Sequence, residues 1–450
     1  MTLIASDTRR IIIGLGKTGY ACARHLAAKG VDFAVVDTRD KPPLAAQFYQ
    51  EFPQVELRCG DLDPEFLCEA TELVLSPGVP KSSPAIQFAL QHDVKVIGDI
   101  DLFCREISAP IIAITGSNAK STVTTLVGEM AKASGVNVAV GGNIGTPVLE
   151  LLQQDPAELY VLELSSFQLE TTHDLKAQAA TVLNISPDHM DRYPDLQSYY
   201  LAKHRIYRGC RHAVINRDDA LTAPLVSQGM KTLSFGLSAP DLGQYGLASH
   251  EGDPWLFKGL EPLLPVSALA LSGAHNVSNV LAAFALGDAV GLQRTAMLSV
   301  AQSFTGLKHR CQFIAKKHDV KYINDSKGTN VGATLAAIQG LGSQLHNTEK
   351  LIVILGGVGK EQRFSELVDP LVQFARAVIL IGEDAELIAK DLEGVNILQA
   401  DALVDAVNLA QQQAQSGDTV LLSPACASFD MFKGYEDRGD QFIQLVEALG

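Results

Sequence analysis

The chain has 450 residues, of which 47% are hydrophobic and 19% are charged, and its formal net charge at pH 7 is −15. This length is too great for one hydrophobic core, so we expect about three domains. The balance of apolar and charged residues is typical of folded globular proteins and excludes a disordered chain. An acidic protein repels the backbone of DNA or RNA, and no basic stripe offsets this charge, so the sequence predicts no nucleic-acid partner.

The longest apolar runs, such as Leu351–Leu355 and Ala377–Ile381, have the length of strands and are too short to span a bilayer. The first residues, from Met1 through Asp7 to Arg10, lack the apolar core of a signal peptide. The 7 cysteines include no Cys-x-x-Cys pair, which argues against a disulfide framework or a zinc knuckle. We therefore expect a cytoplasmic protein that does not insert into a membrane. We also expect a monomer, although none of these features determines the oligomeric state.

Short apolar strands alternate with Gly-rich or polar turns and amphipathic helices along the chain. This alternation predicts an α/β protein in which parallel sheets carry helices on both faces. Changes of pattern beside Gly98 and Gly306 divide it into residues 1–98, 99–305 and 306–450. We expect a Rossmann-like first domain, a central domain with a P-loop ATPase-like parallel sheet, and a Rossmann-like third domain. The Gly- and Pro-rich stretch from Leu237 to Pro265 gives no clear prediction.

The first motif is the glycine-rich run Gly14-Leu15-Gly16-Lys17-Thr18-Gly19, which follows the expected strand Ile11–Ile13 and opens a helix. A second strand ends at Asp37, a suitable position for a carboxylate that bonds a ribose hydroxyl. Ser76-Pro77-Gly78 follows a further strand and is expected on the same rim. The pattern indicates a nucleotide site without naming a reaction, and a tight turn without any ligand is the alternative.

The second motif is more specific. An expected strand, Ile111–Thr115, leads into Gly116-Ser117-Asn118-Ala119-Lys120-Ser121-Thr122 and then into a helix. The amide groups of such a loop hold phosphates, the lysine reaches the terminal phosphates, and the hydroxyl binds Mg²⁺. Ala119 stands where P-loops normally carry glycine, and a positive φ there would strain alanine by about 1 kcal/mol or more.

Polar residues follow other expected strands of the central segment. Glu163 lies near the end of the apolar strand Tyr160–Leu164, which indicates either pairing with a cation or binding of the metal. His189 is flanked by Asp188 and Asp191 after another strand, although a lone histidine is more often an ordinary surface or core residue. The Gly-rich run Gly141–Gly145 also follows a strand, and its Asn143 could point an amide into the cleft.

Four strands of the third segment end in unusual turns, and the carboxyl ends of strands are where open α/β sheets bind ligands. Three of the turns supply Lys or Ser, which suit a small anion, whereas solvated loops are the alternative for any one of them. The turns are Asn324–Asn330, Gly356–Lys360, Gly382–Asp384 and Ser423–Ser428.

Together these motifs resemble the Mur ligase family, in order and over essentially the whole chain. The signs that resemble its D-glutamate-adding members most are the Asp-Ser-Lys-Gly-Thr-Asn run, the Ser-Pro-Ala-Cys-Ala-Ser run and the Gly-Leu-Gly-x-Thr-Gly opening. The four motifs that carry the family resemblance are Gly116–Thr122, Leu162–Gln168, Ser186–Asp191 and Asn324–Asn330.

The resemblance implies an ATP-dependent enzyme that joins D-glutamate to UDP-N-acetylmuramoyl-L-alanine through an acyl phosphate, with two Mg²⁺ ions and a carbamylated Lys203. Implied catalytic residues are Lys120, Asn143, His189 and Lys203, and implied metal ligands are Ser121, Glu163, His189 and Lys203. The implied ATP site comprises Gly116, Ser117, Asn118, Ala119, Lys120, Ser121, Thr122, Asn276, Asn279, Arg310 and Asp325. The implied UDP-substrate site comprises Gly14, Leu15, Gly16, Lys17, Thr18, Gly19, Asp37, Thr38, Arg39, Ser76 and Gly78. The implied D-glutamate site comprises Lys327, Thr329, Lys360, Ser428, Phe429 and Tyr435.

The sequence departs from the family pattern at a few positions. Gln312 and Val358 stand where acidic residues are expected, and Tyr435 stands where Phe is expected. Within this class the alternatives are another Mur-type or a folylpolyglutamate-type ligase. From other classes, the alternatives are a nicotinamide-dependent oxidoreductase, suggested by the Gly14 loop alone, and a non-catalytic nucleotide-binding protein, suggested by Ala119 alone.

Overall fold

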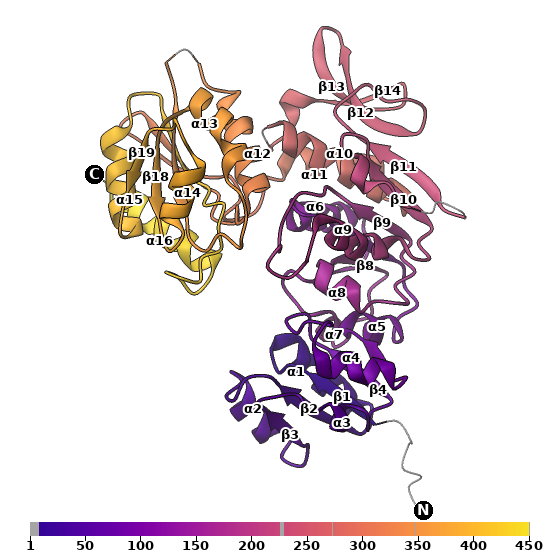
Figure 1. The fold of residues 1–450 in the computed structure, drawn as a ribbon. Coiled ribbons are helices and arrows are strands. Elements are labelled where there is room, and N and C mark those ends of the chain that lie inside the picture. The colour runs from indigo at the N-terminus through magenta and orange to yellow at the C-terminus, as the bar shows by residue number, and fades with distance from the viewer. Residues whose placement is uncertain (1–8, 226–228, 272, 347, 450) are drawn as a thin grey trace, which may run out of the picture. The chain divides into compact units, whose positions relative to one another are not determined.

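The computed structural model describes residues 9–225, 229–271, 273–346 and 348–449 (Figure 1). The first eight residues, where we expected no signal peptide and where the first predicted domain begins, lie outside the described residues. The chain packs into two compact units. The first contains the residues up to Asn184 together with Gln197–Pro265 and Val280–Val300, and the second contains Ile185–Leu196, Val266–Asn279 and the residues from Ala301 onward.

The first sheet, in the first unit, has five parallel strands in the order β3-β2-β1-β4-β5. Because β1 lies between β2 and β4, the loops that follow these three strands meet at one edge of the sheet. This is the Rossmann-like arrangement predicted from the sequence. Its elements are β1 (Arg10–Ile13), α1 (Lys17–Ala28), β2 (Phe33–Asp37), α2 (Ala45–Glu51), β3 (Leu57–Cys59), α3 (Pro64–Leu67), β4 (Glu72–Leu75), α4 (Pro84–Gln91) and β5 (Lys95–Ile97).

The second sheet, also in the first unit, has nine strands in the order β14-β13-β12-β11-β10-β9-β6-β8-β7. The predicted strand before the P-loop, β6, pairs in parallel with β8 and β9. The strands and helices are α5 (Asp99–Cys104), β6 (Ile111–Thr115), α6 (Lys120–Ala133), β7 (Val138–Gly142), α7 (Val148–Leu151), β8 (Leu159–Glu163), α8 (Ser166–Glu170), β9 (Ala179–Val182), α9 (Leu196–His204), β10 (His212–Asn216), β11 (Lys231–Phe235), β12 (Gln244–His250), β13 (Asp253–Lys258), β14 (Glu261–Pro265), α10 (Ala274–Ala289) and α11 (Arg294–Ser303).

The stretch from Leu237 to Pro265, for which we made no clear prediction, contains two antiparallel pairs, β12 with β13 and β13 with β14. The first pair turns through Glu251 and Gly252, both with positive φ, which suits a two-residue hairpin. Three prolines among these strands weaken the alternating pattern that indicates a strand, which is why the strands were not recognised. We predicted a parallel sheet, and the prediction is wrong for these strands, because they pair in antiparallel. Gly141 and Gly142 likewise belong to strand β7, whereas we expected them to follow it.

The third sheet lies in the second unit and has six strands in the order β15-β16-β20-β17-β18-β19, with only β15 antiparallel among them. Alternate residues of β17 enter opposite cores: Val353 and Leu355 pack on one face, and Ile352 and Ile354 on the other. The sheet is therefore covered on both faces, as predicted. Its elements are β15 (Gln312–Lys317), β16 (Val320–Asn324), α12 (Val331–Gly342), β17 (Leu351–Gly356), α13 (Val368–Phe374), β18 (Ala375–Ile381), α14 (Ala385–Asp391), β19 (Ile397–Gln399), α15 (Leu403–Gln413), β20 (Thr419–Leu422) and α16 (Tyr435–Ala448).

The last strand, β20, lies between β16 and β17, although it follows both in the chain. The carboxyl ends of these three strands are consequently neighbours. In the described residues, no helix is both long and apolar enough to cross a membrane.

Candidate active site

The Gly14 loop contacts the ends of both neighbouring strands. Ser76, directly after β4, donates from its hydroxyl to the carbonyl oxygen of Gly14 at 2.9 Å. A Cβ on Gly19 would overlap that same carbonyl oxygen, so helix α1 can approach the loop only with glycine there. The structure thus brings Ser76 to the Gly14 loop, as the sequence analysis expected.

The buried carboxylate of Asp37 forms hydrogen bonds with the Gly14 loop and with Arg39. Its Oδ2 accepts from the amide of Leu15 at 2.6 Å, and Arg39 donates to both carboxylate oxygens at 2.8 and 2.6 Å. Burial raises the pKa of Asp37, but the hydrogen bonds from Arg39 and Leu15 outweigh it and hold that pKa below its ordinary value. Asp37 is 1% exposed, so in this structure its carboxylate orders the loop. Lys17 and Thr18 begin α1, Thr38 directly follows β2, and Gly78 lies two residues after Ser76.

The second glycine-rich loop joins β6 to α6, as a P-loop does. Lys120 bends back so that its Nζ donates to the carbonyl oxygens of Gly116 and Ser117, each at 2.9 Å. Ala119 has a φ of 65°, in the left-handed region, so the condition under which alanine is strained at this position is met. Ser121 and Thr122 are buried in the first turn of α6.

Asn184, which the sequence analysis did not place in the site, fixes the shape of this loop. Its Oδ1 accepts from the amide of Asn118 at 2.8 Å, and its Nδ2 donates to the Asn118 carbonyl at 3.2 Å. The signal that could have found it is a polar residue shortly after the end of the buried strand β9.

Glu163 ends strand β8 with a side chain that is 2% exposed. One carboxylate oxygen accepts from Nδ2 of Asn143 at 2.7 Å. The other, Oε2, has no hydrogen-bond partner in the described part of the chain. A buried carboxylate oxygen without a partner is costly, and it is the type of ligand that a hard cation prefers.

The same described residues contain no group of three or more His, Cys, Asp or Glu side chains that could hold a metal ion by themselves. A cation at Glu163 would therefore need other oxygen ligands, such as the Ser121 hydroxyl and the phosphates of a nucleotide. The donor set present fits Mg²⁺, which usually takes few protein ligands alongside substrate phosphates.

Lys203, on α9, lies beneath the P-loop and is 1% exposed. Its Nζ donates to the Gly116 carbonyl at 2.9 Å and lies 4.5 Å from the centre of the Tyr199 ring. The Tyr199 hydroxyl in turn lies 3.1 Å from the hydroxyl of Ser117. The structure therefore brings Lys203 to the P-loop, and it adds Tyr199, which the sequence analysis missed because nothing local marks a tyrosine on this helix.

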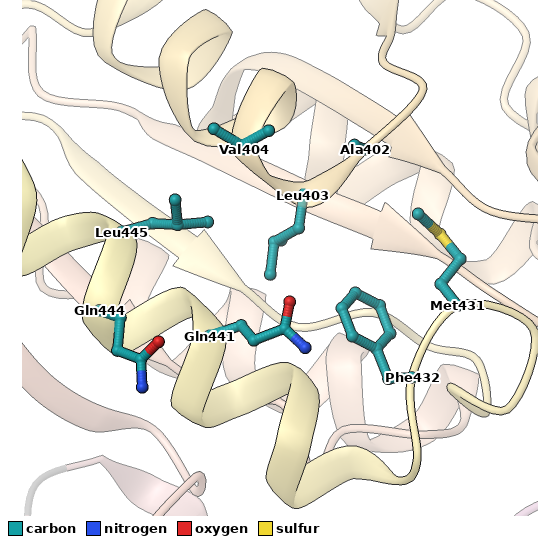
Figure 2. A pocket seen from close by; sticks show the side chains of 8 residues that line it. All are labelled: Ala402, Leu403, Val404, Met431, Phe432, Gln441, Gln444 and Leu445. Atoms are coloured by element: carbon teal, nitrogen blue, oxygen red, sulfur yellow. The ribbon is translucent and has the colours of Figure 1, made fainter.

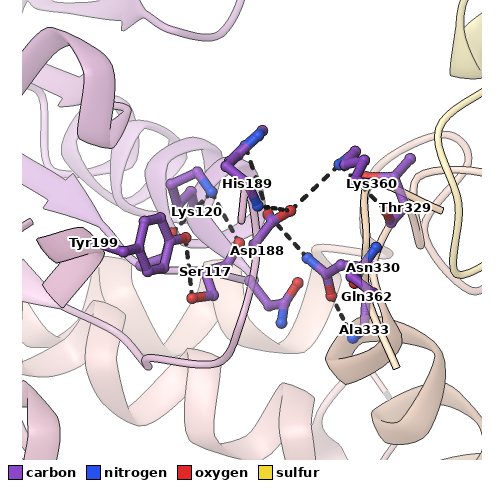
Figure 3. A network of polar contacts seen from close by, with 12 residues as sticks. Ser117, Lys120, Asp188, His189, Tyr199, Thr329, Asn330, Ala333, Lys360 and Gln362 are labelled. Carbon is purple, nitrogen blue, oxygen red and sulfur yellow. Dashed lines mark hydrogen bonds and ion pairs between the residues drawn. The ribbon is translucent and has the colours of Figure 1, made fainter. Parts of the chain in front are cut away.

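His189 and its neighbour Asp188 belong to the second unit, where Figure 3 shows their surroundings. Asp188 is buried, and its carboxylate accepts from Nζ of Lys360 at 3.3 Å and from Nδ2 of Asn330 at 3.1 Å. Lys360 was predicted to bind D-glutamate. In this structure one of its hydrogen bonds goes instead to the carboxylate of Asp188. The sequence analysis named neither Asp188 nor Asn330 as a site residue.

The three turns after β16, β17 and β20 are joined through their backbones. The amide of Ala425 donates to the Gly328 carbonyl at 2.8 Å, and Val358 and Ala427 form a two-way bridge at 2.9 and 3.0 Å. The fourth predicted turn contacts the second, because Asp384 accepts from the amide of Gly359 at 2.7 Å. The structure thus brings these strand-end turns together.

Individual residues of this cluster differ in exposure. Ser428 is 2% exposed, whereas Phe429 is 77% exposed and projects into solvent. Nζ of Lys327 lies 3.8 Å from the centre of the Tyr435 ring, a cation–π distance. Lys360 also contacts the first turn, since its Nζ donates to the Thr329 carbonyl at 3.4 Å.

Asp325 lies at the base of the first turn. Its carboxylate accepts from the amide of Cys311 at 3.1 Å and from the hydroxyl of Ser423 at 2.7 Å. Burial raises the pKa of Asp325 to about 6, although these hydrogen bonds oppose the shift. Arg310 immediately precedes Cys311, so two residues of the predicted ATP site, Arg310 and Asp325, lie at one place in the fold.

Two other residues of the predicted ATP site are also near each other, with Nδ2 of Asn279 donating to Oδ1 of Asn276 at 3.2 Å on α10. A separate cavity of about 370 Å³ lies between α15 and α16 (Figure 2). It contains no predicted site residue, and its lining consists of Ala402, Leu403, Val404, Met431, Phe432, Gln441, Gln444 and Leu445.

Three family models match the chain in order. They describe the N-terminal domain of MurD-like Mur ligases at residues 8–98, the Mur ligase middle domain at residues 114–287, and the glutamate ligase domain of Mur ligases at residues 309–426. The predicted three-domain α/β organisation is thereby confirmed, while the boundaries at residues 98 and 305 stay predictions.

Full-length relatives agree with these matches. A UDP-N-acetylmuramoylalanine–D-glutamate ligase from Pseudomonas syringae pv. tomato is 56% identical over 450 residues, which is 100% of both chains. A ligase of the same name from Pseudomonas aeruginosa is 55% identical, again over 100% of both chains. Among solved structures, the MurF ligase from Thermotoga maritima in complex with ADP has a TM-score of 0.61 at 16% identity and covers 99% of this chain and 96% of its own. That last similarity concerns the fold alone.

Proposed function

This chain belongs to the Mur ligase family, and on that premise we propose that it adds D-glutamate to UDP-N-acetylmuramoyl-L-alanine, with ATP as co-substrate, in the synthesis of peptidoglycan precursors. The observation that carries the proposal is the convergence of the turns after β16, β17 and β20, which bear Lys327, Lys360 and Ser428. The relatives that match over the full length carry the name of this reaction.

The UDP-substrate would bind at the first sheet. The amides of the Gly14 loop and the start of α1 suit its phosphates, since helix N-termini attract anions. Arg39 supports this role because its guanidinium, held by Asp37, remains half exposed at the rim. The loop is thus ordered before any ligand arrives, which lowers the entropy lost on binding.

ATP would bind at the P-loop, with Lys120 turning from its own loop toward the phosphates. Mg²⁺, when bound, would neutralise phosphate charge and stabilise the charge that develops during phosphoryl transfer. Ser121 and Glu163 would hold the first ion, and His189 with a carbamylated Lys203 would hold the second. The buried Oε2 of Glu163 supports the first assignment, and the buried amine of Lys203 beside Gly116 supports the second. Asn143 would orient Glu163 by its hydrogen bond.

The reaction needs activation because a carboxylate and an amine do not condense at neutral pH. The L-alanyl carboxylate oxygen attacks the γ-phosphorus, a new P–O bond forms, and ADP leaves. The amine nitrogen of D-glutamate then attacks the carbonyl carbon of the acyl phosphate, inorganic phosphate leaves, and the nitrogen loses a proton. The protein contributes by positioning the reactants and excluding water, which would hydrolyse the acyl phosphate.

D-Glutamate carries two carboxylates and needs at least two separate anion-binding points. Lys327 and Lys360 supply cations from two turns, and Ser428 supplies a hydroxyl from a third. The pairing of Lys360 with Asp188 supports a role in carboxylate binding, because Lys360 already holds a carboxylate in this structure. A substrate carboxylate would replace Asp188 there. Since ATP is consumed, we place the enzyme in the cytoplasm.

The test measures release of inorganic phosphate from ATP with purified protein, Mg²⁺ and UDP-N-acetylmuramoyl-L-alanine. D-Glutamate, L-glutamate, L-lysine, meso-diaminopimelate and D-alanyl-D-alanine are added one at a time. We expect release with D-glutamate and little with the others, and release that depends on both substrates. Preference for another amino acid would keep the family and refute this member, and release with none would refute the proposal.

A further inference from the structure

Arg438 lies in the first turn of α16, and among the described residues it is the largest side chain that is fully buried, with 0% exposure. In the described residues it forms no ion pair with a carboxylate. Burial lowers the pKa of Arg438 to about 10, so the guanidinium remains charged at neutral pH. A buried cation of this kind is costly to desolvate, and an apolar side chain of similar volume would usually stabilise a core at least as well. Its presence therefore requires an explanation beyond packing.

The hydrogen bonds of Arg438 go to three different strand-end turns. Its Nε donates to the Ser326 hydroxyl at 3.0 Å, and its Nη2 donates to the Ser326 carbonyl at 2.9 Å. Nη2 also donates to the Cys426 carbonyl at 3.2 Å, and Nη1 reaches the Gly356 carbonyl at 3.5 Å. Ser326 adjoins Lys327, Cys426 lies two residues before Ser428, and Gly356 begins the turn that ends at Lys360.

We propose that Arg438 is the positioning residue of the amino-acid site, where its planar guanidinium fixes the spacing of the turns that carry Lys327, Lys360 and Ser428. This inference rests on the proposed function, which assigns those three residues to D-glutamate. Arg438 does not touch the amino acid. It acts through the turns, because their carbonyl and hydroxyl oxygens are its acceptors.

The chemistry of the side chain fits this role. Arginine presents five N–H donors in a rigid plane, whereas lysine presents three donors on a flexible stem. Only the former can reach acceptors on three turns while holding their relative positions. Ser326 strengthens the frame, since its hydroxyl donates to the Tyr435 carbonyl at 2.8 Å while it accepts from Arg438. Tyr435 in turn packs over Lys327.

A second arginine of the same sheet provides a matched control. Arg376, at the start of β18, forms a two-fold hydrogen-bonded pair with the buried Asp418 at 2.7 and 3.0 Å. It lies at the amino ends of the strands, opposite the turns, because Asp418 directly precedes β20. A change there should affect the stability of the same domain without altering the spacing of the turns.

The experiment compares Arg438→Lys, Arg438→Met, Ser326→Ala and Arg376→Lys with the wild type. For each protein, KM is measured for D-glutamate, ATP and UDP-N-acetylmuramoyl-L-alanine, together with the midpoint of thermal unfolding. We expect Arg438→Lys to raise the D-glutamate KM about tenfold or more, as loss of a positioned charged contact does. The other two KM values should stay within about twofold. Ser326→Ala should raise the D-glutamate KM by roughly threefold, since it removes one of the four hydrogen bonds of Arg438 together with the bond from the Ser326 hydroxyl to the Tyr435 carbonyl. Arg376→Lys should lower the unfolding midpoint and leave all three KM values unchanged.

Arg438→Met separates geometry from charge. If Arg438→Lys behaves like the wild type while Arg438→Met is impaired, charge alone matters and the positioning role is refuted. An equal rise in all three KM values, or an unchanged D-glutamate KM in folded Arg438→Lys, also refutes it. If both Arg438 variants fail to fold, Ser326→Ala decides, and an unchanged D-glutamate KM there overturns the inference. If the wild type itself releases no phosphate with D-glutamate, the proposed function fails first and this inference falls with it.

Discussion

The side-chain nitrogen of Lys203 lies 2.9 Å from the carbonyl oxygen of Gly116, so a lysine from α9 contacts the first residue of the P-loop. Both residues are buried. This places the amine where an added carboxylate could face the phosphates of a nucleotide, and it motivates the first prediction.

Replacement of Lys203 by Ala should leave the enzyme nearly inactive, because the carbamate oxygens that would hold Mg²⁺ are lost. Acetate or formate should restore part of the turnover by filling the vacated space with a carboxylate. Lys176→Ala is the control, since that side chain is 71% exposed. The test measures turnover of the variant with each acid at concentrations up to about 200 mM, a range chosen for weak binding. An active, unrescued Ala variant would contradict the carbamate.

Lys120→Ala should abolish turnover while the affinity for UDP-N-acetylmuramoyl-L-alanine stays within about twofold, because the proposed role of Lys120 is on ATP and the proposed UDP site lies on another sheet. Equilibrium binding of the UDP-substrate by calorimetry measures the second quantity. The control is Lys132→Ala, near the far end of the same helix, where an exposed pair with Glu129 contributes little. Wild-type-like turnover of Lys120→Ala would refute the P-loop assignment.

Lys360→Ala and Ser428→Ala should each raise the D-glutamate KM by about tenfold or more, because truncating one partner of a desolvated charge typically costs about 2–5 kcal/mol. Lys327→Ala should in addition lower kcat, since Lys327 follows Asp325 by two residues. Steady-state kinetics with each substrate varied in turn tests this. Lys321→Ala, on the exposed side of β16, should change nothing. A change confined to the ATP KM would make the third domain an ATP lid instead.

Ala119→Gly should be tolerated, because Ala119 has a φ of 65° and glycine relieves the cost of that conformation. That gain, roughly 1 kcal/mol, offsets the larger entropy of glycine in the unfolded chain. The same change at Ala27, an exposed residue within α1, should destabilise by about 0.5–1 kcal/mol. Thermal unfolding of the two variants distinguishes the sites. Equal losses of stability would mean that Ala119 is not strained.

Asp325 should make stability fall as pH rises from about 4 to about 6. Its pKa is about 6 in the folded protein, against an ordinary value of 3.8, so between these values the folded protein keeps a proton that the unfolded chain has lost. Stability declines with pH wherever the folded state binds more protons. Asp325→Asn removes this group, so the difference in unfolding midpoint between wild type and variant should shrink or reverse as pH rises. Parallel profiles for the two proteins would show that Asp325 does not titrate in this range.

The local patterns that the sequence carries were sufficient for the fold class and for most of the candidate site. Glycines before α1 and α6 and short apolar strands before them are local signals, and each structure they predicted is present. Ala119 marks the limit of such patterns, because the sequence showed the departure from glycine and only the structure showed that φ is positive there. The hairpins of β12–β14 were not predicted, since their prolines and short turns hide the strand pattern.

Contacts between distant residues were decided by the tertiary structure alone. Arg438 and Ser326 are 112 positions apart, and Asp188 and Lys360 are 172 apart. No local pattern marks either pair, because what a buried charge touches depends on strand order, here on the insertion of β20 between β16 and β17. The sequence by itself determined which chemical groups stand at the ends of strands. Only the folded chain determined which of them meet, since a hydrogen bond requires its two atoms to lie within about 3.5 Å and sequence separation does not limit that distance.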